Sequence, residues 1–200
     1  MFPIKDVVGS EKMVHHIRRS LAWHYHNDAR EFLSRYSLLR PEDFTKSGRV
    51  KNFVDVLLAA ECALKAHIFL GGSDEEPLQL FKAVKRLSHR IEPLAARADF
   101  LQDRSGYSAV AARFDQLTVD LRYSLDMWET FFPALGDNEQ VARYDKTVAN
   151  TDWRVAAVAE VQFLVNQLTP ALNGENGGGD DFFDELAEMA AFVREAKIIR

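Results

Sequence analysis

The stretch LLAAECALKAHIFLGG, residues 57 to 72, decides the fold, because it is almost continuously apolar over the length of a helix. At about 100° per residue, its large apolar side chains share one arc, and small alanines occupy much of the opposite side. A helix that is apolar nearly all round is typical of the centre of a helical bundle. The sequence therefore predicts a central helix over residues 50–70, ended by a left-handed cap at Gly71-Gly72.

This central helix carries charges in places where burial is expected. Glu61 lies in the middle of the apolar arc, and Lys65 follows it one helical turn later. Because an isolated buried charge costs several kcal/mol, the carboxylate needs a partner, either Lys65 at the favourable i,i+4 spacing or an arginine of a neighbouring helix. A polar network that fixes the helix register is favoured over a catalytic role. His67 projects away from this arc and is interpreted as a partly exposed or hydrogen-bonded side chain.

The rest of the chain divides into further helical segments, because its prolines and glycines fall mostly between periodic stretches and strand-like alternation is nearly absent. Pro93 is expected to kink or end the third helix. The predicted fold class is an all-α antiparallel bundle of five to six helices at residues 1–170, a glycine-rich linker at 171–181 and an extra C-terminal helix at 182–200. Beside the central helix, the predicted helices cover residues 11–39, 73–77 to about 89, 108–132 and 138–168.

Composition limits the possible classes of protein. The 200 residues are 47% hydrophobic and 28% charged, as in ordinary globular domains. The single cysteine, Cys62, excludes an intramolecular disulfide and a cysteine-based zinc site. We find neither a secretory signal nor 18 consecutive apolar residues, so a cytoplasmic protein without a membrane span is expected. The net charge of −5 disfavours nucleic acid for the molecule as a whole, although a local basic face could still bind it.

Two groups of polar side chains, one basic and one rich in histidine, could in principle bind a ligand. Lys82, Lys85, Arg86 and His89 are spaced to form one basic stripe on the third helix. The stripe could hold the phosphate of a nucleotide or RNA, although a solvated helix face is the preferred interpretation. On the first helix, histidines and acids include one metal-like i,i+4 spacing, but an amphipathic helix with polar histidines is much the simpler explanation. No metal or cofactor is therefore predicted.

Three pieces of the chain, "AAECALKAHIFLGG", "SHRIEPL" and "LRYSLDMW", taken together resemble HEPN domains over residues 50–130. "AAECALKAHIFLGG" is similar to the family's A-E-x-x-L-K helix, and "SHRIEPL", residues 88 to 94, is similar to its H-x-L-x-x-L stretch. "LRYSLDMW" resembles the Arg-Tyr motif of a later helix, at Arg122 and Tyr123, with Ser124 where many members have proline. The resemblance implies a helical bundle that forms a homodimer, in a toxin–antitoxin or phage-defence setting.

The resemblance also implies a site and a limit on its chemistry. Active HEPN domains are metal-independent ribonucleases with Arg-x(4–6)-His on a late helix, but no histidine follows His89 in this chain. The first hypothesis is therefore a binding module without ribonuclease activity, for a nucleotide, RNA or partner protein, in which polar side chains line a common cleft. The second is a divergent ribonuclease or toxin that uses His89 with Arg86 or Arg122. The third is a structural interaction protein whose C-terminal helix docks on a partner or swaps within a dimer. The cleft of the first hypothesis would be lined by Glu61, Lys65, His89 and Arg122.

Overall fold

The computed structural model describes residues 11–39, 44–72, 74–132, 138–173, 192 and 194. All regular secondary structure in these residues is helical, which confirms the predicted all-α class. Within the described residues, the helices are α1 (Glu11–Leu38), α2 (Lys46–Leu70), α3 (Pro77–Leu87), α4 (Ile91–Arg97), α5 (Ser105–Arg113), the 3₁₀ helix η3 (Val119–Arg122), α6 (Ser124–Phe131), α7 (Asn138–Lys146) and α8 (Thr151–Asn173).

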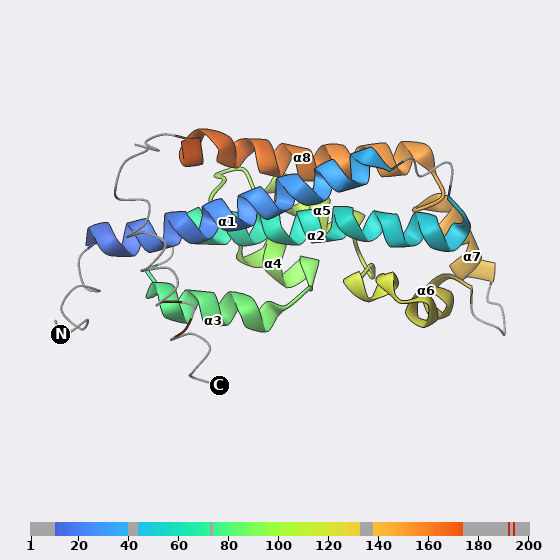
Figure 1. Ribbon diagram of the computed structural model, residues 1–200, viewed down its shortest axis with the longest axis horizontal. Coiled ribbons are helices and arrows are strands. Elements are labelled where there is room, and N and C mark those ends of the chain that lie inside the picture. The colour runs from blue at the N-terminus through green and yellow to red at the C-terminus, as the bar shows by residue number, and fades with distance from the viewer. Residues whose placement is uncertain are drawn as a thin grey trace.

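Helix α2 is the centre of the bundle, as its sequence predicts. From residue 52 to residue 69, every side chain except the half-buried Leu58 is buried. Figure 1 shows α1, α2 and α8 as three long helices side by side, with α3, α4 and α6 on the side of α2 away from α8. Helix α1 runs antiparallel to both α2 and α8 (Figure 1). A helix covered on all sides has no solvent-facing stripe, which explains the absence of a polar face in its sequence.

An aromatic cluster ties four of these helices together near the start of α2. The ring of Phe53 lies 6.2 Å from Tyr36 of α1, 6.0 Å from Phe114 and 5.2 Å from Trp153 of α8, measured between centroids. Phe53 is 1% exposed. Burying one such side chain contributes about 1.5–3 kcal/mol, and the ring contacts add to this. The cluster therefore fixes how α1, α8 and the end of α5 pack around α2.

The end of α2 differs from the predicted left-handed cap. Gly71 has φ −67° and ψ 175°, which is extended backbone. The guanidinium of Arg18 on α1 caps the helix instead, donating from Nε to the Phe69 carbonyl at 3.0 Å and from Nη2 to the Gly71 carbonyl at 2.6 Å. A Cβ at residue 71 would lie 1.6 Å from the Asp99 carboxylate, so any other residue here would displace that side chain.

Two predicted helices are each divided in the structure. Residues 108–132 form α5, η3 and α6, because the backbone turns after α5 and Gln116 adopts φ 60°. Residues 138–168 form α7 and α8, separated by a turn in which the Asn150 side chain accepts a hydrogen bond from the Trp153 amide at 2.9 Å. Helix α8 also continues past Pro170 to Asn173, beyond the predicted end. The predicted count of five to six helices was therefore too low.

The third predicted helix ends earlier than expected. Helix α3 stops at Leu87, residues 88–90 form a turn, and α4 begins at Ile91. Pro93 neither kinks nor ends a helix, since it lies in the first turn of α4, where its missing N–H is tolerated. This turn moves His89 off the helix that carries the basic stripe.

Helix α8 packs into the same core, although its length and composition would also fit a membrane-spanning helix. Residues Thr151–Leu172 are long and apolar enough to cross a membrane by length and composition. In the bundle, α8 packs against α1, α2 and α5, and 33% of its apolar window is buried there, with these buried side chains belonging to the common core. The predicted linker and C-terminal helix lie outside the described residues, apart from 171–173, 192 and 194.

Candidate functional site

A buried carboxylate, a lysine and a histidine form the most unusual polar cluster in the described part of the chain. Glu61 is 3% exposed and Lys65 is 8% exposed. Lys65 donates a hydrogen bond to Oε1 of Glu61, and Nδ1 of His89 lies 2.7 Å from Oε2 of the same carboxylate. Both carboxylate oxygens are thus engaged. The predicted inward position of Glu61 and its pairing with Lys65 are present, and His89 is a second partner that the sequence placed in the same cleft.

The neighbouring groups are held in their neutral forms around this pair. Burial, followed by the charges of nearby groups that include Glu61, raises the pKa of Tyr25 to about 12. Burial, followed by the charge of Glu61, also raises the pKa of the Cys62 thiol to about 12. The Lys65 ammonium lies over the Tyr25 ring, 5.5 Å from its centroid. Because a protonated thiol is a poor nucleophile, Cys62 supplies no thiolate chemistry here.

His89 reaches Glu61 through a constrained turn. Ser88, the residue before it, has φ 53° and ψ −129°, a conformation that favours glycine. On the other side, Ile91 and Leu94 of α4 are buried and anchor the chain. The side chain of His89 is 47% exposed, whereas that of Glu61 is 4% exposed. The imidazole therefore connects a buried carboxylate to the protein surface.

The basic stripe is partly as predicted. Lys82, Lys85 and Arg86 lie on α3, while Val84 on the opposite side is buried. Among the described residues, no acidic side chain forms an ion pair with any of these three cations. His89 does not continue the stripe along a helix, because α3 has already ended. The cationic surface therefore consists of Lys82, Lys85 and Arg86 on α3, and His89 lies in the turn that follows.

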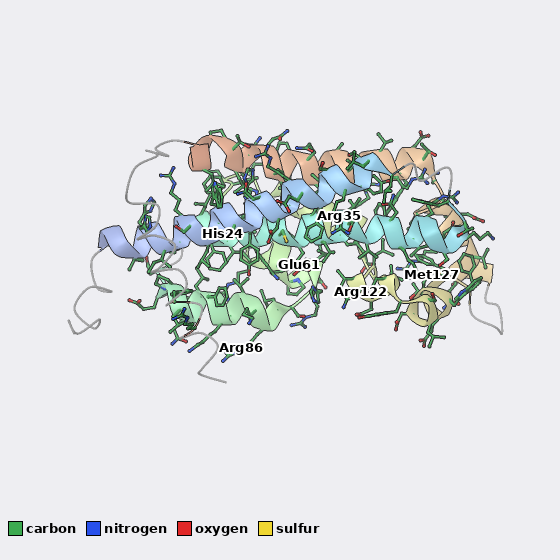
Figure 2. The ribbon with its side chains drawn as sticks, viewed as in Figure 1. His24, Arg35, Glu61, Arg86, Arg122 and Met127 are labelled. Carbon is green, nitrogen blue, oxygen red and sulfur yellow. The ribbon has the colours of Figure 1, made fainter. Side chains whose placement is uncertain are left out.

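Arg122 does not join the cluster. It ends the 3₁₀ helix η3 and is exposed, and its guanidinium lies 4.8 Å from the centroid of the Tyr123 ring. Figure 2 shows Arg122 and Arg86 below α2, on the side on which Glu61 is labelled, but no contact joins either arginine to Glu61 or to His89. The predicted four-residue cleft is therefore reduced to Glu61, Lys65 and His89.

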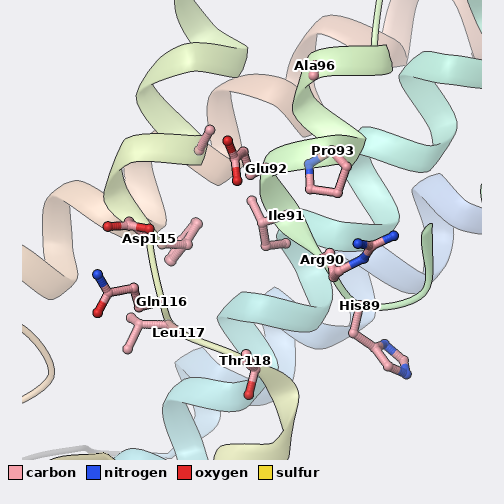
Figure 3. Close-up of a pocket in the computed structure, with 12 residues that line it drawn as sticks. His89, Arg90, Ile91, Glu92, Pro93, Ala96, Asp115, Gln116, Leu117 and Thr118 are labelled. Atoms are coloured by element: carbon pink, nitrogen blue, oxygen red, sulfur yellow. The ribbon is translucent and has the colours of Figure 1, made fainter.

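A groove of about 500 Å³ opens beside His89, between α4 and the end of α5. Figure 3 shows His89 and Arg90 at one end of this groove, with Glu92 and Asp115 on walls that face each other further in. Ile91, Phe114 and Leu117 supply apolar lining. Glu92 and Asp115 disfavour the binding of an anion inside the groove. Their charges oppose an anion less at the end that His89 and Arg90 line.

A second buried polar network, centred on His67, serves the fold. Nε2 of the fully buried His67 donates to the Leu164 carbonyl at 2.9 Å, and Nδ1 accepts from the Tyr107 hydroxyl at 2.9 Å. The Tyr107 oxygen in turn accepts from the Leu101 amide at 2.9 Å. Burial lowers the pKa of His67 to about 4, so it stays neutral. The interpretation of His67 as a hydrogen-bonded histidine is consistent with this network.

Arginine has mainly structural roles elsewhere in the bundle. Arg154 is 3% exposed and donates to the carbonyls of Val148 and Ala149, which join α7 to α8. Arg113 of α5 pairs with Glu160 of α8. These arginines differ from Arg86 in that their guanidiniums are committed to the fold. The sequence does not indicate these structural roles of Arg113 and Arg154, because neither arginine belongs to a recognisable motif.

The C-terminal segment touches the bundle at one described point. Phe192 is half-buried, and its ring packs edge-on against Phe81 of α3, with 5.7 Å between centroids. At this point the tail packs on its own chain. The predicted docking of the C-terminal helix on a partner concerns residues that otherwise lie outside the described part of the chain.

Comparison with protein-family models, curated proteins and solved structures found no match to this chain. The resemblance to HEPN domains therefore rests on the quoted residues alone. The observations that bear on function are the α3 cations, which form no ion pair within the described residues, and the contact between Glu61 and His89.

Proposed function

We propose that this protein is a helical RNA-binding module that contacts phosphates through the α3 cations. The observation that carries this proposal is the contrast between two sets of cations. Arg113 and Arg154 are tied into ion pairs or helix ends, whereas Lys82, Lys85 and Arg86 make no ion pair within the described residues. Cations that the fold leaves available on one helix are the usual electrostatic footprint of nucleic-acid binding.

The arrangement favours a polymer over a single nucleotide. The cations lie along the surface of α3 and not inside an enclosed pocket, and the nearest groove carries Glu92 and Asp115 on its walls. A helix rises about 1.5 Å per residue, so Lys82 and Arg86 are about 6 Å apart along the axis, similar to one nucleotide step of an extended strand. The HEPN resemblance supports the same choice, and the homodimer, the cytoplasmic location and the toxin–antitoxin or defence setting stay predictions.

The test is binding of a labelled single-stranded RNA of about 20 nucleotides, followed by fluorescence anisotropy in EDTA. The variant Lys82→Glu/Lys85→Glu/Arg86→Glu is expected to bind at least about tenfold more weakly than the unmodified protein. A matched control changes three exposed cations elsewhere, Arg30, Lys51 and Lys146, to glutamate. Because both variants change the net charge equally, only a local site separates them.

Two results would contradict the proposal. Equal weakening by both variants would mean that RNA responds to the overall charge and has no site on α3. No binding by the unmodified protein would exclude the function altogether. Polyglutamate added as a competitor tests the remaining hypothesis of an acidic protein partner, since it should displace RNA only if negative charge alone is recognised.

A further inference from the structure

The C-terminal tail, residues 174–200, contacts the bundle beside one of the α3 cations. The ring of Phe192 lies edge-on to that of Phe81, with 5.7 Å between centroids. The Lys85 ammonium lies over the same Phe81 ring, 5.7 Å from its centroid. Both Phe81 and Phe192 are half-buried and pack against the common core. One aromatic ring of α3 therefore contacts both the tail and a cation of the proposed RNA surface.

The part of the tail that precedes Phe192 is strongly acidic. Residues 175–191 contain no lysine or arginine and six acids, Glu175, Asp180, Asp181, Asp184, Glu185 and Glu188. The basic residues of the tail all follow Phe192, at Arg194, Lys197 and Arg200. The charge of the tail thus changes sign at the residue that contacts α3.

The charges along α3 also change sign near Phe81. Before the first turn of α3 lie three acids, Asp74, Glu75 and Glu76, and after Phe81 lie the three cations, Lys82, Lys85 and Arg86. If the tail ran parallel to α3 from the Phe192 contact, its acids would meet the acids before α3, and its bases would meet the cations. In the antiparallel direction, the tail acids meet the α3 cations and the tail bases meet the acids. Charge complementarity therefore selects the antiparallel direction.

The residue spacing of the two segments agrees with this direction. In the C-terminal helix that the sequence predicts, Glu188 precedes Phe192 by four residues, or about 6 Å along the axis. On α3, Lys85 follows Phe81 by the same four residues. Glu185 precedes Phe192 by seven residues, a spacing that puts both on one helix face together with Glu188. An antiparallel tail helix would therefore present its acids toward the cationic end of α3.

We propose that the tail folds back over α3 of its own chain and covers the cations that bind RNA. This inference rests on the RNA binding proposed for α3. The occupant is the chain's own tail, because Phe192 already lies on Phe81 and the acids that precede it match the charge of the surface. RNA is a second polyanion that competes for the same cations. The tail is thus an autoinhibitory element, and RNA binds only to chains from which the tail has been displaced.

The strength of such a contact suits reversible displacement. Each exposed ion pair contributes little, because solvent and salt screen it. The tail belongs to the same chain, however, so its effective concentration at α3 is high. The apparent dissociation constant for RNA is the intrinsic constant divided by the fraction of open chains. A tail that covers α3 in about nine chains of ten would therefore weaken RNA binding about tenfold.

The first test neutralises the tail acids in the full-length protein. The variant Asp184→Asn/Glu185→Gln/Glu188→Gln is expected to bind single-stranded RNA about five- to tenfold more tightly than the unmodified protein, as measured by fluorescence anisotropy at low salt. A matched control changes three exposed acids elsewhere to their amides, at Glu31, Glu129 and Asp145. Because both variants change the net charge equally, the control should tighten binding by less than about twofold.

The variant Phe192→Ala tests the aromatic contact without changing any charge. It is expected to tighten RNA binding in the same way, because it releases the tail from Phe81. The control Phe163→Ala removes an exposed aromatic side chain of α8 and should leave the affinity unchanged. Thermal melts confirm that each variant is folded. If folded Phe192→Ala and the variant without tail acids both bind RNA as the unmodified protein does, the tail does not cover the cations and the proposal is overturned.

A carbodiimide cross-link detects the docked tail without RNA. The reagent joins a carboxylate directly to a neighbouring amine, so it should couple a tail acid to Lys82 or Lys85 within one chain. Mass spectrometry of the cross-linked monomer identifies the two residues, and added RNA should lower the yield. A link that forms only between two chains would mean that the tail of a second copy lies on α3, which overturns docking within the chain. The absence of any link to α3 overturns it as well.

Tail docking and RNA binding can fail separately in these experiments. If all proteins bind RNA with equal affinity and no cross-link forms, the RNA-binding function stands and the tail proposal is overturned. If the cross-link forms but neither the unmodified protein nor the tail variants bind RNA, the proposed function and the competition with RNA are overturned, while the docking stands.

Discussion

At the scale of single residues, the pairing of Glu61 with Lys65 governs both folding and the site. Each partner is buried, and Lys65 would be left as an uncompensated charge without Glu61, whereas Glu61 without Lys65 would keep only its contact with His89. Breaking a buried pair on one side costs about 3–5 kcal/mol, whereas replacing both partners with apolar side chains is often nearly neutral. Changing one partner should therefore cost far more stability than breaking an exposed salt bridge would.

Glu61→Leu is expected to lower the free energy of unfolding by about 3–5 kcal/mol, since it strands the Lys65 ammonium in the core. Adding Lys65→Met should recover most of this loss, because methionine fills similar space without a charge. Urea denaturation of the single and double variants, compared in a double-mutant cycle, measures the effect. If the double variant is the sum of the two single losses, the two side chains do not interact in solution.

His67 gives the molecule a pH dependence of known sign. Burial lowers its pKa to about 4 from an ordinary value of about 6.5, so the unfolded chain takes up a proton first as the pH falls. The stability is complete above pH 6.5 and falls between pH 6.5 and 4, by about 3 kcal/mol in total.

The control for this prediction is His67→Gln, which cannot titrate in that range. The free energy of unfolding of the unmodified protein, measured in urea from pH 7 to 4.5, should fall more steeply than that of the variant. Other groups, such as Asp55, whose pKa is raised by burial, titrate in both proteins and cancel in the comparison. Parallel pH profiles would mean that His67 is protonated or exposed in the folded state.

At the scale of elements, the sequence predicts the central helices and misses the breaks between shorter ones. The segment at 50–70 is apolar all round, and this pattern has one physical solution, a buried helix. The division between α5 and α6 carries no such signal, because residues 114–118 contain neither glycine nor proline and Gln116 takes a positive φ only under tertiary constraint. The Asn150 cap between α7 and α8 is a recognisable signal that a longer helix pattern obscured.

The same limit applies to the site. Glu61 and Lys65 share one helix, so their i,i+4 spacing is readable in the sequence. The approach of His89 from another element depends on the turn at Ser88, whose backbone conformation the sequence does not indicate. Arg122 was grouped with them through the family resemblance, and the fold places it on a separate 3₁₀ helix. Local spacing is predictable, whereas the meeting of separate elements depends on packing.

The end of α2 supplies a prediction about an element boundary. Gly71→Ala is expected to destabilise the protein by about 1 kcal/mol, because the new Cβ would lie within 1.6 Å of the Asp99 carboxylate while the backbone angles suit alanine. The double variant Gly71→Ala/Asp99→Ala should regain the loss, and thermal melts of the three proteins test this. If the double variant melts as low as Gly71→Ala, the glycine is required for a reason other than this contact.

At the scale of the whole molecule, charge distribution matters more than total charge. The chain carries a net charge of −5, which opposes RNA at long range. Binding therefore depends on a local surface, and on α3 the three cations lie in its middle and last turns while Asp74, Glu75 and Glu76 precede its first. Such a local site has a measurable ionic signature, since each phosphate contact releases counterions.

The salt dependence of RNA affinity should thus report these three side chains directly. For single strands, the slope of log K against log salt concentration is about −0.7 for each neutralised phosphate. Lys82→Gln/Lys85→Gln/Arg86→Gln is expected to make this slope shallower by about 2 between 50 and 200 mM salt. The same change at Arg30, Lys51 and Lys146 should leave the slope almost as it was, although it alters the net charge equally. An unchanged slope in the α3 variant would mean that its cations do not touch phosphate, because removing contacts that exist must remove their counterion release.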